Sequence, residues 1–196
     1  MMLIIILPML LLFMVGIVTS TQVVTESDIS IQEGVALAAK AAAETVNPVS
    51  QANGTPRINS DGAHNAFRYV LARNLGLDQN TLAPLANSPY ATPPRYWLVV
   101  YNGDDTYSSS GAQGARIYVF DGSNAASSSL PYTGFPAYFS INSSGITTGQ
   151  GGIATVMLPT PGVVALVEIK AKNILGQTPL ITQRWAAARI HLQGGI

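Results

Sequence analysis

The stretch MMLIIILPMLLLFMVGIV, residues 1–18, decides the expected fold because it contains no charged residue. Only Pro8 and Gly16 within it disfavour a helix. Its length is about the shortest apolar run that can cross a bilayer core of about 30 Å. We expect this segment to begin a helix too long for a domain of this size to cover on all sides, so a membrane or other copies of the chain must surround its first half.

The helical pattern continues through Thr19–Val46 without a strong break. Apolar residues recur there at spacings of three, four and seven, and the charged residues lie largely on the other side. Asn47-Pro48 ends the pattern, since the residue before a proline is pushed out of the helical region. We therefore expect one continuous helix over residues 1–46, roughly 70 Å long. The apolar positions of its second part are Val24, Ile31, Val35, Ala38, Ala39, Ala42 and Val46.

The rest of the chain changes from a helical to an extended pattern. Asn59 or Ser60 caps a second helix over Asp61–Leu75, and Gly76 stands where a left-handed C-terminal cap belongs. Strands are predicted over residues 96–101, 115–120, 153–158, 163–171 and 182–192, with a short one over 137–141. The Ser- and Gly-rich stretch Ser123–Gly152 is otherwise expected to form exposed loops.

The predicted fold class is α+β. It comprises a long N-terminal helix with a hydrophobic first half, a second, shorter helix, and an antiparallel sheet of four to six strands, a pilin-like arrangement. Short links between successive strands favour an antiparallel meander. We expect two parts: residues 1–46 as a membrane or filament-core helix, and residues 47–196 as an extracellular α+β head domain.

Composition excludes several classes of protein. Charged residues make up 10% of the chain, which suits a surface partly buried in an assembly or one outside the cell. Cysteine is absent, so neither a disulfide framework nor a thiolate metal site is available. Residues 1–46 carry four acids and one base, and residues 47–196 carry six acids and nine bases. These bases are too scattered for a nucleic-acid footprint, so no nucleic-acid partner is expected.

No catalytic or cofactor-binding pattern is present in the sequence. The two histidines, His64 and His191, form no metal-binding pair on a helix. A Gly-x-Ser-x-Gly elbow, a P-loop and a dinucleotide fingerprint are all missing. We therefore predict no enzyme, no cofactor and no metal site. Asp104 and Asp105 leave one alternative open, since they suit either calcium or the polar tip of a hairpin.

Two glycosylation sequons lie in predicted loops. They are Asn53-Gly54-Thr55 and Asn142-Ser143-Ser144, so Asn53 and Asn142 are the candidate glycosylation sites; a chance match is the alternative. Four aromatic residues near two prolines indicate either a carbohydrate-binding patch or filling of the core beneath a long loop. They are Tyr132, Phe135, Tyr138 and Phe139.

Residues 1–20 also have to be considered as a secretory signal. Such a signal has a basic start, an apolar core and a cleavage site with small residues. Nothing basic precedes the apolar run here, but Val18-Thr19-Ser20 offers a poor cleavage site. Retention as an anchor or assembly segment is favoured, and cleavage is left open.

The first residues resemble the N-terminal segment of TadE/TadG-like pilins of tight-adherence pili, a branch of the type IV pilin superfamily. The similar residues are Ile4-Ile5-Ile6-Leu7-Pro8, Leu10-Leu11-Leu12-Phe13 and Gly16-Ile17, and later Ala36–Ala43 and Ala63–Leu77. The resemblance covers roughly the first 77 residues. The chain departs from that family in having Met2 and Leu3 where Glu-Phe is usual. The family's basic leader is expected to be missing here if Met1 starts the primary product, and its absence is explained if Met1 is the first residue after cleavage.

This resemblance implies a structural subunit of an extracellular pilus or pilus-like filament at the cell surface, with a role in adhesion. Such a subunit stands in the inner or plasma membrane before assembly, meets the pilus assembly machinery, and then polymerises with copies of itself into a helical filament. The filament-core residues implied are Leu3, Ile6, Leu7, Pro8, Leu11, Leu12, Val15 and Gly16.

A second class of function is also consistent with the sequence. The apolar segment would anchor a membrane-bound extracytoplasmic binding module, which takes its ligand as a monomer. A secreted enzyme with a cleaved signal is the third class, and the missing catalytic pattern disfavours it.

Overall fold

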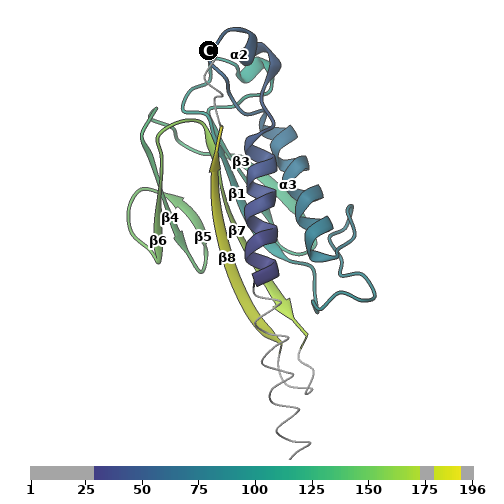
Figure 1. Ribbon diagram of the computed structural model, residues 1–196. Coiled ribbons are helices and arrows are strands. Elements are labelled where there is room, and N and C mark those ends of the chain that lie inside the picture. The colour runs from purple at the N-terminus through teal and green to yellow at the C-terminus, as the bar shows by residue number, and fades with distance from the viewer. Residues whose placement is uncertain (1–28, 173–178, 191–196) are drawn as a thin grey trace, which may run out of the picture.

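The computed structural model describes residues 29–172 and 179–190, which form three layers (Figure 1). A helical layer covers one face of a five-stranded antiparallel sheet, and a three-stranded antiparallel sheet covers the other face. The helices are residues 29–43, α2 (Pro48–Ala52) and α3 (Ser60–Leu75), with a short 3₁₀ turn at Ser108–Ser110. The strands are β1 (Arg95–Tyr101), β2 (Ala115–Phe120), β3 (Ala125–Ser129), β4 (Ala137–Asn142), β5 (Gly145–Thr148), β6 (Ala154–Leu158), β7 (Gly162–Ala171) and β8 (Leu180–Arg189).

The second predicted helix is confirmed with its caps. The Asn59 side chain accepts a hydrogen bond from the Gly62 N–H at 2.8 Å, so Asn59 is the N-cap of α3. Gly76 ends the helix in the left-handed region at φ 61°, where a residue with a side chain would be strained.

The predicted fold class is wrong in its long N-terminal helix. The helix described over residues 29–43 ends there, before Val46, which pairs with Ile58 in a β-bridge. Asn47 then caps α2, with Pro48 at its first position, so Asn47-Pro48 starts a helix rather than only ending one. The longest helix with both ends described, α3, has 16 residues. In the described chain strand residues outnumber helical residues, and residues 1–28 lie outside it.

We find no helix in the described ranges that is both long and apolar enough to cross a bilayer.

The strands form two sheets instead of the single sheet predicted. Eight strands are described in two sheets, with the orders β3-β2-β1-β7-β8 and β5-β4-β6. The strands predicted over residues 96–101, 115–120, 153–158 and 163–171 correspond to β1, β2, β6 and β7. Within Ser123–Gly152 the short strand predicted over residues 137–141 is confirmed as β4, but the rest is not only loops, because it also carries β3 and β5. Periodicity missed β3 because all five of its side chains are exposed, and the strand is defined by its backbone pairing with β2.

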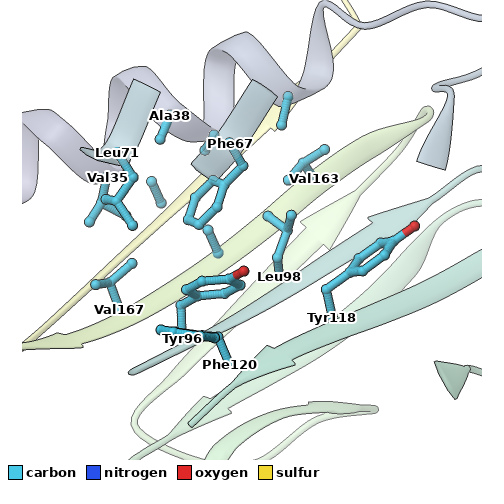
Figure 2. Packing of buried hydrophobic residues seen from close by; sticks show 14 of the residues in the cluster. Val35, Ala38, Phe67, Leu71, Tyr96, Leu98, Tyr118, Phe120, Val163 and Val167 are labelled. Atoms are coloured by element: carbon cyan, nitrogen blue, oxygen red, sulfur yellow. The ribbon is translucent and has the colours of Figure 1, made fainter. Parts of the chain in front are cut away.

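The first core lies between the helices and the five-stranded sheet. The aromatic rings of Phe67 and Tyr96 meet edge to face with centroids 5.3 Å apart, and Tyr96 stacks on Phe120 at 5.4 Å. Figure 2 shows the side chains of this core; those labelled are Val35, Ala38, Phe67, Leu71, Tyr96, Leu98, Tyr118, Phe120, Val163 and Val167.

The second core lies between the five-stranded and the three-stranded sheets. Alternate residues of β1, among them Trp97 and Val99, point into it and meet Phe139 and its neighbours on β4 and β6. Gly145 begins β5 at φ 138°, and a Cβ there would lie 2.9 Å from the Trp97 Nε1. The close approach of the two sheets at Trp97 therefore requires glycine at this position.

One buried amide ties the helical layer to the turn after β1. The Asn102 Oδ1 accepts from the Ile58 N–H at 2.7 Å, and its Nδ2 donates to the carbonyl oxygens of Ile58 at 2.9 Å and Gln113 at 2.8 Å. Asn102 is fully buried, so water would not replace its side chain as a hydrogen-bond partner of these backbone groups.

Replacing this amide is expected to destabilise the fold. Asn102→Ala leaves buried backbone groups of Ile58 and Gln113 unpaired, which lowers the free energy of unfolding by about 2–4 kcal/mol. Urea unfolding of the full chain in a mild detergent, followed by tryptophan fluorescence, measures the loss. The matched control is Asn124→Ala at an exposed position, where a change within about 0.5 kcal/mol is expected. Equal stability of the two variants would contradict the role of Asn102.

Candidate functional site

The predicted filament-core residues, Leu3 to Gly16, lie outside the described residues, and so does His191. The described chain starts at residue 29, at the end of the helical layer opposite α2 (Figure 1). Candidate functional residues in the structure are therefore sought on the surfaces of the three layers.

The two aspartates near the start of the β1–β2 turn, Asp104 and Asp105, are engaged by protein donors. The Arg57 Nη2 donates to the Asp104 Oδ2 at 2.7 Å. Asp105 accepts from the Gly114 N–H at 2.7 Å and from the Tyr132 hydroxyl. Burial opposes ionisation of Asp104, but the hydrogen bonds from Arg57 and Thr106 still hold the pKa of this carboxyl below its usual value. Of the two alternatives, this arrangement favours the polar hairpin tip.

His64 belongs to a cluster of aromatic and charged side chains between α3 and the sheet. Its Nε2 lies 2.7 Å from the Tyr96 hydroxyl, and its ring stacks on Tyr118 with centroids 4.3 Å apart. The Tyr118 hydroxyl donates to Asp61 at 2.8 Å, and Arg116 lies 3.8 Å from the same carboxylate. These contacts join α3 to β1 and β2, so we assign the cluster a role in stability.

Burial sets the protonation state of this cluster. It lowers the pKa of His64 from its ordinary 6.5 to about 4, and Arg68 adds to the effect. Burial also raises the pKa of Tyr96 to about 12, and burial together with Asp61 raises that of Tyr118. His64 is therefore neutral at pH 7.

The two sequons differ in exposure. Asn53 is exposed at the C-cap of α2. Asn142 is half-buried at the end of β4, and its Oδ1 accepts from both the N–H and the hydroxyl of Ser144, at 2.9 and 2.7 Å. Glycosylation of either residue stays a prediction.

The structure does not bring the four aromatic residues into one patch. Phe139 is buried in the second core, and Phe135 meets Tyr101 edge to face at 5.5 Å. The Tyr132 hydroxyl donates a hydrogen bond to Asp105 in the β1–β2 turn. Only Tyr138 lies on the outer face of the three-stranded sheet, 38% exposed.

The outer face of the three-stranded sheet is the feature that the sequence analysis missed. Tyr138 and Met157 are directly opposite each other on β4 and β6, and Ile153, just before β6, is 78% exposed. The signal was visible in the sequence, because residues 122–167, which contain the whole of this layer, include no Asp, Glu, Lys, Arg or His. A surface without charged residues that exposes Tyr and Met is typical of a protein interface.

A groove of about 420 Å³ lies on the opposite side of the molecule, between the 29–43 helix and α3. Leu37 and Tyr69 line it and are about half exposed, at 50% and 46%. Lys40, Glu44 and Arg73 stand among its lining residues.

In the ranges that the structure describes, no three His, Cys, Asp or Glu side chains are grouped so that they hold a metal ion. Comparisons of the chain with protein-family models, with curated proteins and with solved structures gave no match. The uncharged sheet face and the helical groove are therefore the candidate functional surfaces.

The stability of the fold is expected to depend on pH through His64. Its pKa is lower in the folded than in the unfolded chain, so between pH 6.5 and about 4 the unfolded chain binds more protons, and stability falls as the pH falls. Because the ring is only partly buried, we expect a loss of about 1–2 kcal/mol. Urea unfolding at pH 6.5 and at pH 4 measures it.

His64→Gln is the matched variant, because glutamine keeps a polar partner for Tyr96 and does not titrate. The variant should lack the loss of stability over this pH window. A decrease of the same size in both proteins would contradict the assignment.

Proposed function

We propose that the chain is a structural subunit of an extracellular filament at the cell surface. In this proposal the apolar segment Met1–Val18 stands in the membrane before assembly and then packs among copies of itself. The described residues, 29–172 and 179–190, form the outer part of the filament. The subunit needs no cofactor, and its partners are other copies of the chain and the machinery that assembles them.

The observation that carries the proposal is the presence of two apolar or uncharged surfaces in one chain. Residues 1–18 contain no charged residue. The three-stranded sheet, which lies within residues 122–167, contains none either. A subunit of a polymer needs such surfaces, since each copy buries them against its neighbours. A protein that stays monomeric in water rarely exposes two such surfaces.

The resemblance of residues 4–17 to tight-adherence pilins supports the same proposal. An apolar segment that moves from a membrane into a filament core exchanges one low-dielectric environment for another. Its transfer therefore requires no exposure of apolar surface to water.

A charge in the apolar segment is expected to abolish filaments. Leu11→Asp or Leu12→Asp places a carboxylate where the polymer or the membrane offers no water, at a cost of about 2.5–3.5 kcal/mol per subunit or more. Electron microscopy of material sheared from cells, together with the pellet from high-speed centrifugation, measures filament yield.

The matched control is Gln22→Asp, which adds the same charge outside the apolar run and should leave filaments intact. Far-ultraviolet circular dichroism of each variant should show unchanged strand content. Normal filaments from Leu11→Asp would contradict the proposal. Wild-type protein found only as monomers in detergent extracts would instead favour the membrane-anchored binding module.

A further inference from the structure

We propose that the outer face of the three-stranded sheet of one copy packs into the groove between the 29–43 helix and α3 of the next copy. This contact rests on the proposed function and names the surfaces through which the folded parts of neighbouring subunits meet. The occupant of the groove is thus a second copy of this chain.

The sheet face presents a compact apolar ridge. Tyr138 is 38% exposed and Met157 is 51% exposed, and the two are partners across β4 and β6. Their neighbours along each strand, such as Phe139 and Val156, point the other way into the second core, so the strands hold the ridge rigidly. Because the layer carries no charge, burying it removes no ion from water.

The groove offers a matching surface. Its apolar part comes from Leu37, Ala41, Tyr69 and Val70, and its volume of about 420 Å³ is large enough to take several side-chain atoms. Two of the charged residues beside the groove pair with each other. The Lys40 Nζ lies 4.0 Å from the Glu44 Oε1, one helical turn away. Arg73 adds a cation, for which the ring face of Tyr138 is a favourable neighbour.

The positions of the two surfaces favour an open polymer. They lie on opposite sides of the five-stranded sheet, since alternate residues of β1 point to the helices and to the three-stranded sheet. A contact between two different surfaces on opposite sides leaves one of each free after every addition, so it can repeat, and it gives an open filament when the rotation between copies does not close into a ring.

The start of the described chain supports the same contact. Residue 29 lies at one end of the helical layer, and the apolar residues 1–18 precede it (Figure 1). If copies are joined through those residues, every folded part is tethered at the same end. Neighbouring copies then meet through their sides, which are the helical layer and the three-stranded sheet.

The absence of cysteine makes a direct cross-linking test possible. The full chain with Leu37→Cys and Met157→Cys is assembled, pelleted, and treated with a short bis-maleimide. On a denaturing gel we expect a ladder of dimers, trimers and larger products. Their yield should exceed that of a control pair by at least about tenfold, because contact raises the effective concentration of the two thiols.

The control pair is Val49→Cys with Ser127→Cys, two exposed positions outside the proposed contact. Polymer that pellets normally but gives no ladder above this control would overturn the contact and leave the proposed function standing. Failure of the unsubstituted chain to form any polymer would overturn both. Dimers from the single variant Met157→Cys would show that the ridge meets itself, and would also overturn the contact.

Discussion

Strand β1 is buried on both faces, and every residue from Tyr96 to Tyr101 contributes to one of two cores. Its even-numbered residues support the helical layer and its odd-numbered residues support the three-stranded sheet, because side chains alternate along a strand. β1 pairs with β2 on one side and β7 on the other, so neither edge is open. The three layers thus share one central strand, and a change there affects both candidate surfaces.

The two candidate surfaces follow from this arrangement. Since the helices and the three-stranded sheet lie on opposite sides of β1, each presents its outer face to solvent. The groove and the Tyr138–Met157 ridge are those faces. Several polar side chains of the described residues make contacts that stabilise the fold. Carboxylates such as Asp104 and Asp61 are engaged by neighbouring side chains, and the partly buried His64 packs in an aromatic cluster. A function in assembly would use these two outer surfaces.

Sequence patterns predicted the elements that depend on side chains. The caps of α3 at Asn59 and Gly76 have a local chemical cause, and β1 and β7 are continuous apolar runs because both faces are buried. The elements held by backbone pairing were missed, above all β3, whose Ala and Ser side chains are all exposed. The continuous helix was predicted wrongly because its apolar spacing extends to Val46, while the pairing of Val46 with Ile58 involves residues that periodicity does not consider. The ridge was missed because Tyr138 and Met157 become neighbours only through strand pairing.

The central claim is that this chain polymerises with its apolar segment retained. The most direct measurement is the intact mass of the protein in filaments that are sheared from cells and pelleted without detergent. The account predicts a mass that includes residues 1–18, in a fraction where electron microscopy shows filaments. A mass that lacks about the first twenty residues, or protein recovered only from detergent-extracted membranes, would contradict it.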